Sequence, residues 1–126
     1  MRDLASNIAV VTSIAPAVLT ATAIGTSVDL LGFNSAALVI STGAIAGAGD
    51  FAPKLQESDD GTTFTDVAAS DVTGTAPAAL AATSTVELGY KGFKRFIRPV
   101  LTLVSGTSIA AAAVVIRGNP AKSPAA

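Results

Sequence analysis

The stretch FAPKLQESDDGTTFTDV, residues 51–67, has the clearest strand pattern in the chain. Between residues 51 and 57 every second side chain falls on one side of an extended segment, and the first three of these are apolar. The tripeptide Asp59-Asp60-Gly61 then interrupts the alternation, and residues 64–67 resume an extended run. Glycine takes a positive φ without steric cost, and aspartate can hydrogen-bond its own backbone, so both suit a turn. The pattern predicts a β-hairpin with a polar turn.

Short alternating stretches also occur on both sides of this hairpin. Residues 8–14 alternate, and Pro16 closes that run because proline cannot donate to a ladder. For the same reason we expect Pro99 to lie at a sheet edge or a bulge. Further strands are predicted at residues 17–23, 27–31, 35–45, 83–90, 95–104 and 109–117, with a long crossing loop at 68–82. About seven or eight short strands separated by turns predict an all-β fold, an antiparallel β-sandwich of the immunoglobulin-like or jelly-roll-like kind with an extended N-terminal arm.

The length of 126 residues suits a single domain. We expect an N-terminal arm at residues 1–16, a β-sandwich domain at 17–120 and a C-terminal tail at 121–126. Low-complexity ends of this kind are ordered by partners, which favours a member of an assembly. We expect no signal peptide, because Asp3 stands beside Arg2. No run reaches the roughly 18 apolar residues of a membrane span, so no membrane partner is expected.

The composition excludes most catalytic chemistry. The chain has no cysteine and no histidine, so it lacks thiolate ligands, disulfides, imidazole ligands and a Ser-His triad. We therefore expect no enzyme, no catalytic residue and no cofactor. Charged residues make up 13% of the chain, about half of the usual share of roughly 25%, and the net charge is −1. A near-neutral chain lacks the basic face that nucleic acid requires, and its uncharged surface suits an assembly.

The acidic residues of the hairpin could gather around a calcium ion. Glu57, Asp59, Asp60 and Asp66 supply the hard oxygen ligands that this ion prefers. The spacing of an EF-hand loop is missing, however, and acidic side chains are ordinary in turns. We interpret this segment as a solvated turn and expect no metal site.

The sequence YKGFKRFIR, residues 90–98, is the basic cluster of the chain. Alternation of cations with aromatic rings can serve nucleic-acid binding, but this cluster is small. We favour pairing of its cations with carboxylates, either within the fold or on a neighbouring subunit. Plain solvation of these side chains is the alternative.

Three segments carry a resemblance to a known family: KLQESDDGTTFTDV (54–67), GYKGFKRFIRPVLT (89–102) and AAAVVIRGNP (111–120). In this order they resemble the capsid decoration proteins of tailed bacteriophages, also called cement or head-stabilising proteins. The family pattern opens with Val-Asp-Leu, here at positions 28–30, so the resemblance covers residues 28–120. Pro99 departs from the pattern, because a residue able to donate a hydrogen bond is more usual there.

The resemblance implies a structural virion protein that binds the outer surface of an icosahedral phage capsid and stabilises contacts between major-capsid subunits. It implies the major capsid protein as partner and a homo-oligomer, with a trimer favoured. It also implies a location on the phage head surface, and in the bacterial cytoplasm during assembly. It supplies no catalytic residue. Two alternatives stay open: a carbohydrate-binding or adhesive β-sandwich on the virion, and a connector or tail component of the same particle.

The candidate partner contacts lie in the arm and in the basic cluster. Apolar side chains of the arm would be buried at junctions between subunits, and cations of the cluster would act as polar anchors. These candidates are Leu4, Ile8, Val10 and Ile14 in the arm, and Lys91, Lys94 and Arg95 in the cluster.

Overall fold

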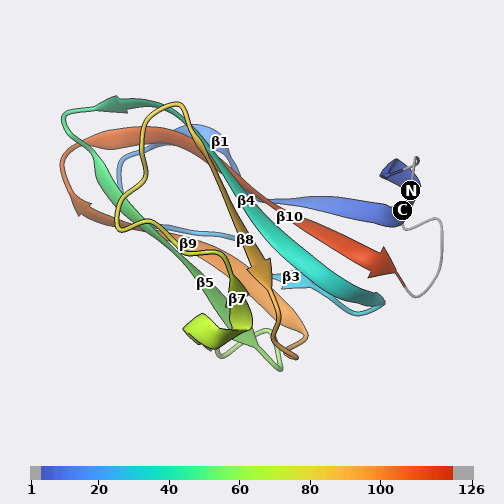
Figure 1. Ribbon diagram of the computed structural model, residues 1–126. Coiled ribbons are helices and arrows are strands. Elements are labelled where there is room, and N and C mark those ends of the chain that lie inside the picture. Colours follow the sequence, from blue (N-terminus) through green and yellow to red (C-terminus); the bar gives the residue numbers. More distant parts are fainter. Residues whose placement is uncertain (1–3, 121–126) are drawn as a thin grey trace.

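The computed structural model describes residues 4–120, and the side chains of residues 4–118. Two antiparallel five-stranded sheets pack face to face (Figure 1). Sheet A has the strand order β1-β10-β4-β8-β7, and sheet B has the order β2-β9-β5-β6, with β3 also paired to β9. The predicted all-β antiparallel sandwich is confirmed. Its strands are β1 (Ile8–Leu19), β2 (Ala23–Ile24), β3 (Val28–Asp29), β4 (Phe33–Ala46), β5 (Asp50–Ser58), β6 (Thr65–Asp66), β7 (Val72–Thr73), β8 (Thr85–Tyr90), β9 (Phe96–Ser105) and β10 (Ser108–Pro120).

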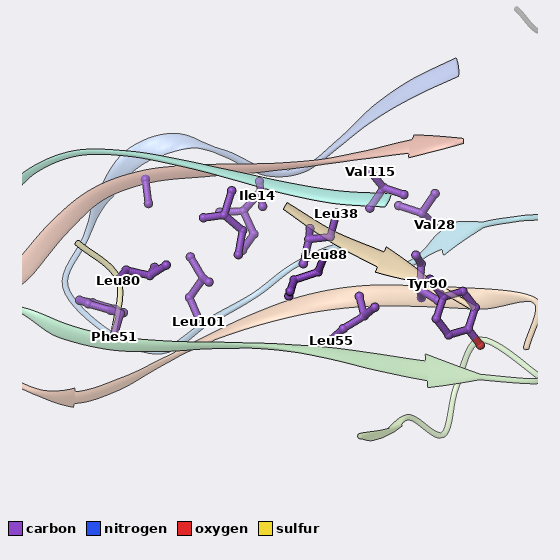
Figure 2. Packing of buried hydrophobic residues seen from close by; sticks show 14 of the residues in the cluster. Ile14, Val28, Leu38, Phe51, Leu55, Leu80, Leu88, Tyr90, Leu101 and Val115 are labelled. Carbon is purple, nitrogen blue, oxygen red and sulfur yellow. The ribbon is translucent and has the colours of Figure 1, made fainter. Parts of the chain in front are cut away.

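The core fills the space between the two sheets, as Figure 2 shows. Alternate residues of each long strand point inward, because successive side chains of a strand face opposite sides of its sheet. The largest fully buried side chains are Phe51, Leu38, Ile40, Leu88, Ile97, Leu101, Ile109, Val115 and Pro99. Alanine at two inward positions of β10, Ala111 and Ala113, lets the sheets approach closely there.

The predicted hairpin at residues 51–67 is present as β5 and β6. Gln56 pairs with Asp66 and Glu57 with Thr65, on either side of the acidic turn. Phe51 and Leu55 are buried, as the alternation predicts. Two 3-10 helices of three residues, η1 (Ala5–Asn7) and η2 (Ala69–Asp71), are the helical turns of the described chain. The η2 turn and the short β7 lie within the predicted crossing loop.

The N-terminal region is a strand of the sandwich. β1 runs from Ile8 to Leu19 and pairs with β10 along its length, so the predicted boundary at residue 16 falls inside it. Pro16 does not close the run as expected. It sits between Ile14 and Ala17, where the pairing register shifts, and this edge position requires no ladder hydrogen bond from its nitrogen. A truncation after residue 16 would therefore remove a paired strand. The predicted tail at residues 121–126 lies outside the described residues.

Two predicted strands have different bounds in the structure. Residues 17–19 belong to the end of β1, and of the separate strand expected at 17–23 only Ala23 forms part of another strand, β2. The strand expected at 27–31 likewise shrinks to β3. Both short strands lie along β9 in sheet B, so the chain crosses from sheet A to sheet B between Leu19 and Ala23.

A tight contact joins Ser13 of β1, in sheet A, to the segment between β2 and β3 of sheet B. The Ser13 hydroxyl donates to the Thr26 carbonyl (2.6 Å), and the Thr26 amide and hydroxyl both donate to the Ser13 carbonyl (each 3.0 Å). Gly25 packs between Ser13 and Pro99, and a Cβ on it would approach the Pro99 ring to 2.7 Å.

Pro99 occupies a strand with neighbours on both sides. The Gly25 amide donates to the Pro99 carbonyl at 2.8 Å, and in an extended strand the nitrogen of a residue points to the same side as its carbonyl. The nitrogen of Pro99 therefore faces the interruption between β2 and β3. We expected Pro99 at a sheet edge or a bulge. Instead, a gap between the neighbouring strands β2 and β3 leaves no hydrogen bond for its nitrogen to donate.

Candidate interaction surface

One end of the sandwich carries a cleft of about 420 Å³. The segment between β3 and β4 forms one wall, and the loop between β8 and β9, residues 91–95, forms the other. Its apolar lining includes Leu30, Leu31, Phe33 and Phe93, with Tyr90 and Arg95 beside them. The basic cluster predicted from the sequence therefore forms part of a hollow surface.

Tyr90 fixes the shape of the β8–β9 loop. Its side chain is buried in the core (Figure 2), and its hydroxyl donates to Glu57 Oε1 at 2.7 Å. The same hydroxyl accepts the Lys94 amide at 3.0 Å. Burial, followed by the hydrogen bond to the Glu57 carboxylate, raises the pKa of Tyr90 well above its ordinary value. Gly92 lies against the phenol, where a Cβ would come within 2.5 Å of the hydroxyl oxygen.

Two ion pairs hold the same loop from outside. Lys94 Nζ lies 2.7 Å from Asp59 Oδ2, and this contact raises the pKa of Lys94. Arg95 donates from Nε and Nη2 to the two carboxylate oxygens of Asp29, at 2.8 and 2.7 Å. This bidentate contact lowers the pKa of Asp29 from its usual 3.8 to about 2. The expectation that these cations pair with carboxylates is confirmed within the fold, while their role as anchors for a partner stays a prediction.

Lys91 differs from its neighbours in the loop. Its side chain is exposed and forms no ion pair within residues 4–118. Since Lys94 and Arg95 are neutralised by Asp59 and Asp29, Lys91 supplies the unpaired positive charge of this loop. The end of the sandwich is therefore a weakly charged surface, without the run of free cations that binds phosphates.

Two large apolar side chains stand at the rim of the cleft. Phe93 is 100% exposed and Leu31 is 68% exposed. Such exposure is costly for a phenyl ring, and exposed aromatic residues are enriched in protein interfaces. The sequence places Phe93 among the aromatics of the basic cluster, and its position between Gly92 and Lys94 in a turn is a signal of exposure. Leu31 has no comparable signal, because it follows an apolar residue and precedes a glycine.

Of the contact residues predicted in the arm, some are exposed in the structure and one is buried. Leu4 is 58% exposed and Val10 is 54% exposed, and Ile8 is partly exposed. Ile14 is buried in the core, so its side chain does not face a partner. The register shift between Thr12 and Ile14 turns the following side chain inward, and alternation alone predicts the opposite.

Val10 belongs to an apolar surface that we call the outer face of sheet A. It pairs with Ile116, which pairs with Ala37, and the next row joins Val114 to Val39. Paired residues of a sheet share one side, so these side chains point away from the core. The face also carries Val18, Thr12, Ala110, Ala112, Ser41, Gly43, Thr85, Glu87 and Gly89.

The opposite surface, the outer face of sheet B, carries a connected polar network near the hairpin. Arg98 Nε donates to Gln56 Oε1 at 2.9 Å, and Gln56 Nε2 donates to Asp66 Oδ1 at 3.0 Å. Lys54 Nζ lies 3.2 Å from the same Asp66 oxygen, and the Arg98 guanidinium lies 4.0 Å from the centre of the Phe64 ring. Hydrogen bonding to Gln56, followed by the contact with Lys54, lowers the pKa of Asp66.

The acidic tip of the hairpin is held by its own hydrogen bonds. Asp60 Oδ1 accepts the amides of Thr62 (2.8 Å) and Thr63 (3.0 Å) and the Ser58 hydroxyl (2.9 Å). The Thr63 and Thr62 amides, in that order, are the main reasons that the pKa of Asp60 is lowered to about 2. Within residues 4–118 no group of three acidic side chains is arranged to hold a metal ion. In the same described region, no helix has the length and apolarity to cross a membrane.

Comparisons with known proteins found a structural match but no match by sequence. No protein-family model matches the chain, and no curated protein matches it. One structural match is a chain from the "Structure of infectious bursal disease virus Gx strain", with 12% identity and a TM-score of 0.44. The match covers 87% of this chain and 31% of that one, so this chain spans less than a third of its length. A TM-score of this size does not establish a common fold or function.

Proposed function

We propose that the chain is a structural protein of a virus particle, which binds the outer surface of an icosahedral phage capsid and stabilises contacts between major-capsid subunits. The observation that carries the proposal is the pair of exposed apolar side chains, Phe93 and Leu31, at the rim of a cleft. The resemblance of residues 28–120 to phage capsid decoration proteins supports the choice of partner.

The loop bearing Phe93 is held in place before it binds. Tyr90, Lys94 and Arg95 fix it through a buried hydrogen bond and two ion pairs. A pre-organised anchor loses little conformational entropy on binding, so more of its burial contributes to affinity. Full burial of a phenylalanine side chain stabilises a contact by about 1.5–3 kcal/mol. Repeated over many copies on one shell, contacts of this size would stiffen it without any chemical step.

Charge complementarity indicates which kind of surface on the shell this loop would bind. Lys91 is the unpaired cation of the loop and lies two residues from Phe93. We expect an apolar depression on the major-capsid subunit, with a carboxylate at its border that faces Lys91. Lys94 and Arg95 act chiefly by holding the loop, because Asp59 and Asp29 already occupy them.

The experiment adds purified protein to particles of the encoding virus that were assembled without it. Phe93→Ala should weaken binding by about thirtyfold, the effect of a side chain worth about 2 kcal/mol. The matched control is Val104→Ala, because Val104 is 61% exposed on the outer face of sheet B and lies outside the cleft. Occupancy can be measured by co-sedimentation over a range of protein concentrations. Equal binding by Phe93→Ala and the unaltered chain would contradict the proposed site.

A further inference from the structure

The outer face of sheet A has no covering element in the described part of the chain. Across β1, β10, β4 and β8 its side chains are Val, Ile, Ala, Gly, Ser and Thr, with Glu87 as the charged exception. Val10 and Val18, 54% and 66% exposed, mark its β1 border. Contiguous apolar surfaces of this kind on soluble proteins mark interaction sites.

We infer that this face packs against the same face of a second copy of the chain, as a twofold pair. The inference concerns a surface separate from the cleft at the loop end, and it goes beyond the proposed function by naming where one copy meets another. It does not depend on the identity of the shell partner.

The size of the face is sufficient for such a pair. Three strands of about nine residues and the six-residue β8, with about 4.8 Å between strands and about 3.4 Å per residue, cover on the order of 500 Å². Two such faces bury about 1,000 Å² in total, which reaches the lower limit of about 1,000 Å² for a specific interface. The pleated side chains add further area beyond the flat rectangle.

The chemistry of the other surfaces favours a like-with-like contact. The outer face of sheet B carries Lys54, Asp66 and Arg98 in its polar network, and an apolar partner would desolvate them. Away from Glu87 on β8, the face has no charge that would be left buried and unpaired when it meets its own copy. Ala112 and Ser41, which pair in the middle of the face, are small enough for close approach of two sheets.

The edge of sheet A is poorly suited to the alternative of strand addition. β1 is the long edge strand of sheet A, since β7 at the other edge has two residues, and the register of β1 shifts twice between Thr12 and Ala17, around Pro16. Irregularities and proline on an edge strand prevent continuous pairing with another chain. Association through the face, rather than through the edge, is therefore the arrangement that this strand allows.

The test is the mass of the full chain in solution, measured by sedimentation equilibrium or light scattering. The unaltered chain should be a dimer. Val114→Lys, in the centre of the face, should shift the protein to a monomer, because it buries a cation against an apolar surface. Ser41→Lys should do the same, and because Ser41 is exposed this substitution leaves the core intact. The matched control, Thr102→Lys on the outer face of sheet B, should stay dimeric.

Each outcome separates this inference from the proposed function. A monomer of the unaltered chain overturns the inference, and so does a dimer that survives both lysine variants. A trimer, the order favoured by the family resemblance, overturns the twofold pair. If Val114→Lys lowers binding to particles while the unaltered chain is monomeric, the face contacts the shell and the inference is wrong. A dimer that does not bind particles would contradict the proposed function and leave the inference standing.

Discussion

The outer face of sheet A carries Glu87 as its charged side chain among the described residues, whereas the outer face of sheet B carries a network of Lys54, Gln56, Asp66 and Arg98. Both sheets bury apolar side chains on their inner sides. The polar groups of the sheet B network form hydrogen bonds with water, so their exposure has little cost in free energy. The valines and alanines of sheet A form no such bonds, so removing them from water is favourable. The two outer faces of one sandwich are therefore suited to different surroundings: the face of sheet B to solvent, and the face of sheet A to a partner.

The largest effect is expected at Gly25, where the segment between β2 and β3 of sheet B packs against Ser13 of sheet A. Gly25→Val places side-chain atoms where Ser13 and Pro99 already lie, so it should lower the free energy of unfolding by about 3 kcal/mol through overpacking. Urea unfolding measures this loss. The control, Ala44→Val, adds similar bulk at an exposed position of β4 and should change stability by less than about 0.5 kcal/mol. An unchanged midpoint for Gly25→Val would show that the two sheets are not tightly joined at this point.

A second change makes the outer face of sheet B resemble that of sheet A. Arg98→Leu removes the hydrogen bond to Gln56 and the stacking on Phe64, and it should cost about 1 kcal/mol of stability. The new apolar surface should increase self-association, which light scattering would detect. Arg98→Lys keeps the charge but loses the planar stacking, so it should remain as soluble as the unaltered chain. If Arg98→Leu does not associate further, charge is not what keeps this face in solvent.

The smallest expected effect is the loss of stability on replacing Asp66, and it depends on pH in the acid range. The pKa of Asp66 is lowered in the folded chain, so its carboxylate stabilises the fold above the usual pKa of 3.8, and this contribution is lost as the pH falls through the lowered value. Because Asp66 is 64% exposed, Asp66→Asn should cost no more than about 1 kcal/mol at neutral pH. The difference between variant and unaltered chain should disappear in strong acid. Thermal unfolding over a pH series measures it, and a difference that persists in acid would rule out the charge as its source.

The sequence predicted some features of the candidate surface and missed others, and the reasons are physical. Lys94 and Arg95 have short-range sequence neighbours that are aromatic or basic, and their carboxylate partners lie 35 and 66 residues away. No local pattern identifies such partners. Alternation in residues 35–45 predicts a strand but does not show which of its faces is covered, and Val39 faces outward on a surface that no described element covers.

The sequence by itself determined the class of fold, because two-residue alternation and Asp-Gly turns are local properties of the chain. The hairpin of residues 51–67 is the clearest case, with Phe51 and Leu55 buried as their spacing requires. The tertiary structure alone decided that Ile14 points into the core and that Pro99 faces a gap between two short strands. Both outcomes depend on register shifts and strand interruptions, which arise when distant segments pair and cannot be read from the spacing of neighbours.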